Sequence, residues 1–469
     1  MESVDPRKQT GENLTAKYGA KCLMNNDNLL PGMRPFVDAK PTSNESKPDK
    51  KGRLYLWDPN EPPPILGKHS LAKHRILRTY LEKYVAILAS KPVQDAFRVS
   101  LVDGFSGGGV YRDPESNELI SGSPLLMVEA MNAAEEAANE WRDKQFSLKA
   151  DFYFIEKDKV TFEYLGEQLK QNRDAHQRMD NIHLLNGGFS RELDRVIKNI
   201  KSSGRANRAI FLLDQYGYKD VTLANMRKIF KELPNAEIIL TFAVDWFADF
   251  INETGRFETA LRNLELADQK DLLLNLRQQH ASDWRPAVQH VLHNHFFSKS
   301  GAKYYTPFFI HSVDSHRAYW LLHFSRHSKA RDVMMQLHWE MENHFQHFGG
   351  AGLGMFGTLG YDPRNDIETP LLPFQFDSVA AEQTNESLLD SLPRRISDFN
   401  GEISFAAFCD AVANETPATK QMLGQNISDL SRENELAIYT SAGRRRRNGV
   451  QIAAEDVIVV PRQRLLLPR

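Results

Sequence analysis

A carboxylate and a run of glycines follow the first strongly apolar stretch of the chain. Residues 98–102 are predicted to form a strand, and Asp103 comes directly after it, with Phe105 two residues further on. The run from Gly107 to Gly109 allows a tight turn and a close approach of a ligand to the backbone. The G-x-G-x-x-G spacing of dinucleotide-binding proteins and the Lys-Ser/Thr of a phosphate-binding loop are both missing. The alternative is a glycine turn that serves only the sheet.

A second acid, Glu156, follows the predicted strand at 151–155. An acid at the tip of the second parallel strand can accept hydrogen bonds from a ribose diol. Glu156 lies 49 residues after Gly107, whereas the usual separation is about 20 residues. The excess falls in residues 111–121 and in a long first helix, so ribose binding remains the prediction. The alternative is a solvated acid at a strand end.

A third acid is followed by two aromatic residues. Asp214 comes after the predicted strand at 209–213, and Tyr216 and Tyr218 come next along the chain. A carboxylate accepts hydrogen bonds from an amine, and an aromatic ring that stacks on a base contributes about 1–3 kcal/mol. This combination indicates a site that binds a nucleobase and holds its nucleophilic amino group. The alternative for Asp214 is a cap on the next helix.

Lys73 and His74 lie on a helix predicted at 69–89, where apolar residues recur at three- and four-residue steps. At the mouth of a site, Lys73 would meet a phosphate or a carboxylate, and His74 would form a polar wall. The alternative is solvated charges in the first turns of the helix. The histidines at 290–295 have no acid or cysteine at a recognisable ligand spacing, so no metal site is predicted.

Short apolar strands alternate with amphipathic helices through the middle of the chain. The predicted strands are residues 98–102, 151–155, 182–185, 209–213 and 237–242, and the helices are residues 123–140, 159–172, 190–202 and 221–232. Ser123 is expected to cap the first of these helices. Such alternation predicts a parallel sheet covered on both faces. An inserted helical pair at about 253–297, a hairpin of 304–311 and 318–326, and a helix at 328–345 follow.

Four segments are expected from these patterns. Residues 1–52 are polar and bury too little to offset their ordering entropy, which predicts a disordered or extended leader. Residues 53–348 form one large α/β domain. Residues 349–400 are a glycine-rich loop and a linker, and residues 401–469 are a small separate domain.

The small domain is predicted to contain three helices and a hairpin. The helices are expected at 403–412, from Thr416-Pro417 onward and at 422–434, and the strands at 436–440 and 457–460. This order resembles a winged helix-turn-helix.

The tip of its hairpin is basic and carries Arg444, Arg445, Arg446 and Arg447. Residues 441–469 contain seven arginines and two acids, a local charge of +5. Such a tip suits phosphate contacts or a minor groove, which predicts nucleic-acid binding. The alternative is a solvated charge run or a contact with a protein partner.

The composition limits the possible classes of protein. The chain has 469 residues, with 59 Lys and Arg against 61 Asp and Glu, and the net charge of -2 excludes a uniformly basic nucleic-acid binder. Two cysteines exclude a disulfide framework and indicate a reducing compartment. No apolar run is long enough for a signal peptide or a membrane span. A cytoplasmic protein without membrane contact is therefore expected.

Taken together, the motifs resemble those of a known family. In order they are Lys68-His69-Ser70-x-x-Lys73-His74, Asp103-Gly-Phe-Ser-Gly107, Gly122-Ser123-Pro124-Leu125, Phe154-Ile-Glu156 and Leu213-Asp214-Gln215-Tyr216-Gly217. Over roughly residues 53–345 the chain resembles the three-Cys-motif partner proteins (TcmP), bacterial proteins of class I methyltransferase type. The family is named for pairing with a radical-enzyme-like protein that carries a three-cysteine motif.

The resemblance implies a Rossmann-like class I methyltransferase sheet, a C-terminal winged helix and S-adenosylmethionine as the cofactor. Asp103 would face the methionine amino group. The other cofactor-binding residues would be Phe105, Gly107, Gly109, Glu156 and, by stacking on adenine, Phe189. The catalytic residues would be Asp214, Tyr216, Tyr218 and Lys73. Asp214 and the tyrosines would replace the D/N/S-P-P-aromatic motif of amino-methylating enzymes, with nucleic acid as the substrate. The alternative is a non-catalytic nucleic-acid-binding subunit that keeps the fold.

Overall fold

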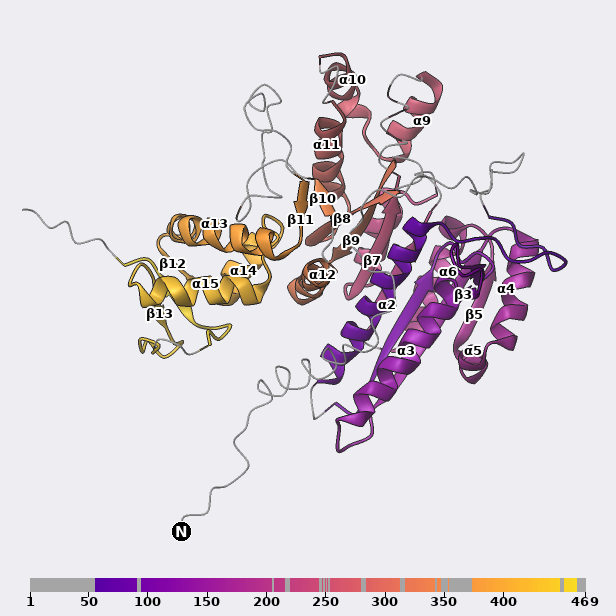
Figure 1. The fold of residues 1–469 in the computed structure, drawn as a ribbon, viewed down its shortest axis with the longest axis horizontal. Coiled ribbons are helices and arrows are strands. Elements are labelled where there is room, and N and C mark those ends of the chain that lie inside the picture. The colour runs from indigo at the N-terminus through magenta and orange to yellow at the C-terminus, as the bar shows by residue number, and fades with distance from the viewer. Residues whose placement is uncertain are drawn as a thin grey trace, which may run out of the picture.

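A computed structural model describes most of the chain after residue 54 (Figure 1). It covers residues 55–90, 94–204, 206–215, 220–243, 254–279, 284–312, 317–341, 344–346, 373–447 and 451–461, together with residues 247, 249, 251 and 353. The predicted leader at 1–52, nearly all of the glycine-rich segment at 349–361, and both Tyr216 and Tyr218 lie outside the described residues.

Seven strands form the central sheet, in the spatial order β5-β4-β1-β6-β7-β9-β8. They are β1 (Ala96–Asp103), β4 (Ser147–Glu156), β5 (Ile182–Asn186), β6 (Ala209–Leu213), β7 (Ala236–Phe242), β8 (Tyr304–Ser312) and β9 (Arg317–Ser325). The first five pair in parallel, and β9 pairs antiparallel with both β7 and β8. The predicted mostly parallel sheet and the hairpin after the insertion are confirmed. The chain winds to one side of β1 and then to the other, so β1 and β6 border a topological switch point.

Helices cover both faces of the sheet. One face carries α2 (Lys68–Ala89), α3 (Ser123–Glu140), α4 (Lys159–Gln171), α5 (Arg173–Gln177) and α12 (Ser328–Glu340). The other carries α6 (Phe189–Ser203), α7 (Leu223–Glu232), α9 (Thr254–Asn263), α10 (Lys270–Gln279) and α11 (Trp284–Lys299). Short 3₁₀ helices span Met179–Asn181 and Ala267–Gln269. β6 and β7 are buried along their whole length, as strands between two helical layers must be. The predicted helical pair is three helices, which stand at the top of Figure 1.

A small hairpin is inserted between the glycine turn and α3. It consists of β2 (Val110–Arg112) and β3 (Leu119–Ser121), paired antiparallel. The chain just before α2, residues 55–67, lies along this hairpin and is called the strap. In it, Leu66 N donates to Arg112 O and Trp57 Nε1 donates to Val110 O, at 2.9 and 2.8 Å. The hairpin accounts for part of the long separation between the glycine turn and Glu156.

The C-terminal module has its own hydrophobic core and lies at the left of Figure 1. Its elements are α13 (Ser378–Ser397), β12 (Glu402–Ser404), α14 (Phe405–Val412), α15 (Lys420–Arg432), β13 (Ala437–Tyr439) and β14 (Val457–Val459). The three strands form one antiparallel sheet in the order β12-β14-β13. Ahead of the module, β10 (His344–Gln346) pairs with β11 (Pro373–Gln375).

The module is docked on α12 through buried hydrogen bonds. The Arg331 side chain is buried and donates to the carbonyl oxygens of Thr416 and Ala418. Trp339 Nε1 donates to Pro417 O at 2.9 Å. A charged group that satisfies two backbone carbonyls in a buried interface fixes the position of the segment it holds.

Three further sequence predictions are wrong. The expected linker at 349–400 contains α13 at residues 378–397. Thr416-Pro417 begins no helix, because α15 starts at Lys420 with Thr419 as its cap. Ser123 lies inside α3, whose N-cap is Gly122 without a side-chain hydrogen bond.

Candidate active site

Three acidic residues lie at the carboxyl edge of the sheet. Asp103 ends β1, Glu156 ends β4, and Asp214 directly follows β6. In the pairing register, Asp103 is level with Phe154 on one side and with Leu212 on the other. Glu156 and Asp214 therefore each stand two residues further out on the two strands that flank β1. The structure thus brings the three acids together at the switch point.

Asp103 is completely buried and only half satisfied. Its Oδ1 accepts a hydrogen bond from Phe105 N at 3.1 Å, whereas Oδ2 has no partner among the described residues. Burial raises the pKa of the Asp103 carboxyl to about 7, although hydrogen bonding by the Ser123 side chain and by Phe105 N acts in the opposite direction. The charges of Asp214 and Glu156 add to the effect of burial. A carboxyl group in this state favours a positively charged hydrogen-bond donor beside it.

The glycine turn adopts backbone conformations that suit glycine. Gly107 has a φ of 59° and Gly109 a φ of 81°, in the left-handed region. The Trp57 ring of the strap packs on the turn so closely that a Cβ added at Gly108 would lie 2.3 Å from it. The turn therefore needs glycine for strap packing, whatever else it binds.

Glu156 fixes the turn from the neighbouring strand. Its Oε2 accepts from Gly107 N at 3.0 Å, and its Oε1 accepts from Asp158 N at 2.8 Å. An ionised carboxylate offers about four acceptor positions, so these two bonds leave room for two ribose hydroxyls. Burial raises the pKa of Glu156, although the backbone hydrogen bonds oppose this. Asp158 caps α4 by accepting from Thr161 N.

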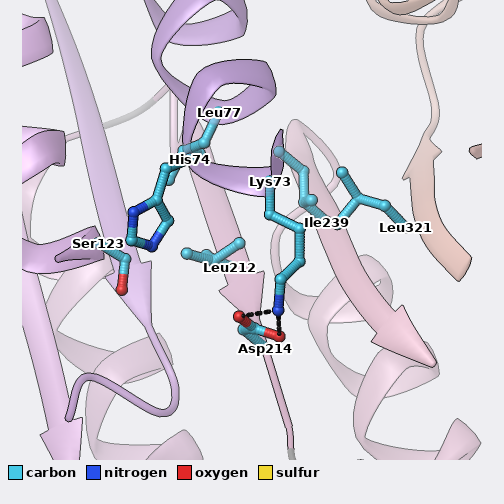
Figure 2. Close-up of a pocket in the computed structure, with 8 residues that line it drawn as sticks. All are labelled: Lys73, His74, Leu77, Ser123, Leu212, Asp214, Ile239 and Leu321. Carbon is cyan, nitrogen blue, oxygen red and sulfur yellow. Dashed lines mark hydrogen bonds and ion pairs between the residues drawn. The ribbon is translucent and has the colours of Figure 1, made fainter. Parts of the chain in front are cut away.

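Lys73 on α2 reaches the acid at the end of β6 (Figure 2). Its Nζ lies 2.7 Å from Asp214 Oδ1 and 2.6 Å from Oδ2. The side chain of Lys73 is 11% exposed and that of Asp214 is 29% exposed, so the pair is partly accessible. Burial alone would raise the pKa of Asp214, but the ammonium of Lys73 holds it below its usual value. The interpretation of Asp214 as a helix cap is wrong, because Thr222 caps α7.

His74 stands beside this ion pair as a neutral imidazole. Burial and the charge of Lys73 lower the pKa of His74 to about 4. Figure 2 shows its ring facing Ser123, on the opposite side of the site from Lys73. The cavity that these residues line has a volume of about 10 Å³, which holds one water at most. A larger molecule can therefore reach Asp214 only from its exposed side.

Gln215 anchors the loop after Asp214. It is 4% exposed, and its Oε1 accepts from Asp220 N and Val221 N, both at 3.1 Å. The side chain thus ties the start of the loop to its end. The two predicted tyrosines, Tyr216 and Tyr218, belong to this loop and lie outside the described residues.

The two predicted aromatic cofactor residues pack against each other. The rings of Phe105 and Phe189 lie 6.0 Å apart at their centroids. Phe189 is 2% exposed and belongs to the main hydrophobic core, where it packs under Gly104. Stacking of its ring on adenine stays a prediction. Phe105 is only partly buried and lies at the edge of that core.

The four predicted nucleic-acid-binding arginines differ in their surroundings. Arg446 donates to Asp456 Oδ1 at 2.8 Å, and this aspartate is buried. Arg445 is exposed and donates to Asn434 Oδ1 at 3.1 Å. Arg444 and Arg447 are exposed. Arg446 is thus part of the module's internal structure, and its role in nucleic-acid binding stays a prediction.

No family model matches the sequence, and no curated protein is significantly similar to it. Among solved structures, LPL1258 from Legionella pneumophila is 10% identical, over 58% of this chain and 91% of its own, with a TM-score of 0.33. The N-terminal domain of human METTL16 in complex with SAH is 11% identical, over 54% and 70%, with a TM-score of 0.26. P. horikoshii TYW2 in complex with MeSAdo is 14% identical, over 59% and 70%, with a TM-score of 0.22.

These likenesses are weak, and the chain's own strand order defines its fold. The sheet is mostly parallel, winds to both sides of β1 and carries β9 antiparallel near one edge, which matches a Rossmann-like methyltransferase fold. None of the described helices is long and apolar enough to cross a bilayer. The described residues include no group of three or more His, Cys, Asp or Glu that could hold a metal ion.

Proposed function

We propose that the protein is an S-adenosylmethionine-dependent methyltransferase that acts on nucleic acid. The observation that carries the proposal is Asp103, a fully buried carboxyl at the switch point with one oxygen unpaired among the described residues. A buried acceptor without a partner costs roughly 1–3 kcal/mol. The methionine amino group of the cofactor is a cationic donor that would remove this cost.

The groups around Asp103 fit the rest of the cofactor. Glu156 keeps acceptor positions for the two ribose hydroxyls, and the turn from Gly107 to Gly109 brings backbone close to the same strand ends. The cofactor, when bound, supplies an activated methyl group. A cation beside Asp103 favours its ionised form, so binding lowers the pKa of this carboxyl and releases its proton.

Asp214 is the residue that would hold the target atom. Lys73 keeps it ionised at neutral pH, so it accepts a hydrogen bond from an amino or hydroxyl group of the substrate. The same ion pair fixes the direction of the carboxylate. Tyr216 and Tyr218, in the loop tied by Gln215, supply rings for base stacking. Catalysis then rests on positioning rather than on a covalent intermediate.

The order of elements in the C-terminal module supports a nucleic-acid substrate. A helix, a strand, two helices and two further strands follow each other from α13 to β14, which is the order of a winged helix-turn-helix. The second helix of the pair, α15, would enter a groove. The exposed Arg444, Arg445 and Arg447 lie between β13 and β14, in the segment that corresponds to the wing of such a fold. There they would contact phosphates.

The resemblance to the TcmP family adds a partner to the proposal. Its motifs fall on the residues that carry the candidate site, including Lys73, Asp103, Glu156 and Asp214. A radical-enzyme-like protein with three cysteines would act together with this chain. Co-purification of the two proteins expressed together would support this part, and their separation on a sizing column would count against it.

The proposal is tested in two steps. Calorimetry with S-adenosylmethionine should show binding by the full chain and none by the Asp103→Asn variant. Radiolabelled methyl transfer should then reach DNA or RNA, and Lys73→Met should reduce it strongly without removing cofactor binding. Absence of cofactor binding by the unchanged protein would end the methyltransferase proposal.

One observation favours the second candidate, a non-catalytic nucleic-acid-binding subunit. Trp57 already occupies one side of the glycine turn, so Gly107 and Gly108 are accounted for without a cofactor. Under this alternative the chain binds nucleic acid through Arg444 and its neighbours and transfers no methyl group. This alternative would be favoured if the protein binds nucleic acid but calorimetry detects no binding of S-adenosylmethionine.

A further inference from the structure

A second cavity lies at the opposite edge of the sheet from the candidate active site. Its volume is about 240 Å³, and the residues that line it include Tyr80, Tyr84, Arg208, Glu237 and Lys329. Arg208 precedes β6 and Asp214 follows it, and a strand of this length separates its ends by roughly 17–20 Å. The cavity is therefore distinct from the site proposed for methyl transfer.

A buried carboxylate forms part of its wall. Glu237 is 4% exposed, and its Oε2 accepts from the Tyr80 hydroxyl and lies 3.1 Å from His323 Nε2. Both interactions fall on the same oxygen, and Oε1 accepts no hydrogen bond from a described residue. The reaction proposed above uses none of these three residues. An oxygen in this position favours a ligand that carries a hydrogen-bond donor, and a cationic donor most of all.

Two more polar groups are available to a ligand in the cavity. The Arg208 side chain forms no ion pair with a described residue, and the Tyr84 hydroxyl forms no hydrogen bond with one. Lys329 lies on the exposed rim, where its ammonium approaches Asp332 at only 3.8 Å. Burial raises the pKa of the Tyr84 phenol, so it remains a neutral donor. The cavity therefore has two basic side chains, Arg208 and Lys329, and one acidic side chain, Glu237.

Asn235 and His327 also line the cavity, and their side chains are paired with each other at 2.9 Å. The rest of the wall is apolar. Ile87 and Leu88 come from the last turns of α2, and Ala330 and Val333 come from the first turns of α12. These side chains offer no hydrogen bonds and favour a hydrocarbon body. The cavity thus places an acceptor, a cationic group and an apolar wall around a space of small-molecule size.

We propose that this cavity binds a small zwitterion of the amino-acid class with an apolar side chain. The ammonium group of the ligand meets Glu237 Oε1, its carboxylate meets Arg208 and the Lys329 rim, and its side chain lies against Ile87 and Val333. The assignment is independent of the proposed methyl transfer. It rests on no residue of the candidate active site.

The cavity and the candidate active site share one element, the helix α2. Tyr80 and Tyr84 line this cavity from α2, and Lys73 reaches Asp214 from the same helix. Seven residues separate Lys73 from Tyr80, a rise of about 10 Å along the axis.

Three matched probes test the two polar contacts separately. Phenylalanine carries both charges, 3-phenylpropanoate only the carboxylate, and phenethylamine only the ammonium. Calorimetry on the full chain should show phenylalanine binding about tenfold tighter than either analogue. Arg208→Gln should weaken phenylalanine about tenfold and leave phenethylamine unchanged, since a charge-assisted hydrogen bond contributes at this level. Glu237→Gln should weaken phenylalanine and phenethylamine but not 3-phenylpropanoate.

Two further variants locate the binding. Ile87→Trp fills the cavity and should abolish binding of all three probes, whereas Arg195→Gln, an exposed arginine on α6, should change nothing. If Glu237→Gln fails to fold, Arg208→Gln and Ile87→Trp still decide the matter. The proposal is overturned if phenylalanine binds no tighter than both analogues. It is overturned equally if Ile87→Trp leaves its affinity intact.

Discussion

Replacing Asp103 with asparagine should stabilise the free protein at neutral and alkaline pH while removing cofactor binding. The Asp103 carboxyl is fully buried and lacks a partner for one oxygen among the described residues. In the ionised state it carries a charge that the interior does not compensate. Asparagine keeps an oxygen for the Phe105 amide and carries no charge. Stability and binding should therefore change in opposite directions.

The size of the effect follows from the raised pKa. Burial takes the pKa of Asp103 from 3.8 to about 7. Between these values the folded protein holds a proton that the unfolded chain has lost, so the stability of the folded state falls as the pH rises. The difference corresponds to about 4 kcal/mol at most, at about 1.4 kcal/mol per pH unit. The advantage of Asp103→Asn should therefore be close to zero near pH 4 and complete above pH 7.

Urea unfolding at pH 5 and pH 8 measures this directly. The free energy of unfolding of Asp103→Asn should exceed that of the unchanged protein by more at pH 8 than at pH 5. Glu163→Gln, an exposed carboxylate on α4, is the matched control and should show no such dependence. Calorimetry of the same samples reports cofactor binding. A variant no more stable than the unchanged protein at pH 8, or equally favoured at both pH values, would refute the reasoning.

Four other substitutions have expected outcomes. Lys73→Met leaves a partly buried carboxylate without its counter-ion and should cost about 2–3 kcal/mol at neutral pH, less in acid, by urea unfolding. Gly108→Ala places a Cβ 2.3 Å from the Trp57 ring and should destabilise the protein by about 1–3 kcal/mol, measured by the same assay. Arg446→Gln should lower the melting temperature of the module, whereas Arg447→Gln should leave it unchanged and weaken nucleic-acid binding with a smaller salt slope.

The parallel core was predictable because its signals are local. The strand at 209–213 and the helix at 123–140 match the structure residue for residue, since continuous apolar runs and amphipathic periods mark buried strands and helices. The helix α13 was missed, although its buried residues recur every four positions from Ala380 to Ile396. Its polar surface and the internal Pro393 favour a loop when read alone.

Non-local contacts explain the other misses. Thr416-Pro417 has the pattern of a helix start, yet the carbonyls of this segment accept hydrogen bonds from Arg331 and Trp339 instead. These donors lie on α12, and no local pattern around Thr416 reveals them.

The candidate site was predictable in part. Acids at the ends of neighbouring parallel strands must meet at one edge, which placed Asp103, Glu156 and Asp214 correctly relative to the sheet. The pairing of Lys73 with Asp214 joins positions 141 residues apart. The packing of Trp57 on the glycine turn likewise depends on how the strap folds back. Only the folded chain reveals such pairs.

The docking of the C-terminal module on α12 has a geometric consequence. Arg331 and Trp339 hold the segment before α15 by its backbone carbonyls. The C-terminal module is therefore docked on the α/β domain that carries Asp103 and is not merely tethered to it. A nucleic acid held at the wing would then present its reactive base at a set spacing from the bound sequence. In the proposed reaction, the methylated position would be set by its distance along the strand from the segment bound at the C-terminal module. A substitution of Arg331 would make that distance less uniform, although Arg331 belongs neither to the arginine surface of the module nor to the candidate active site.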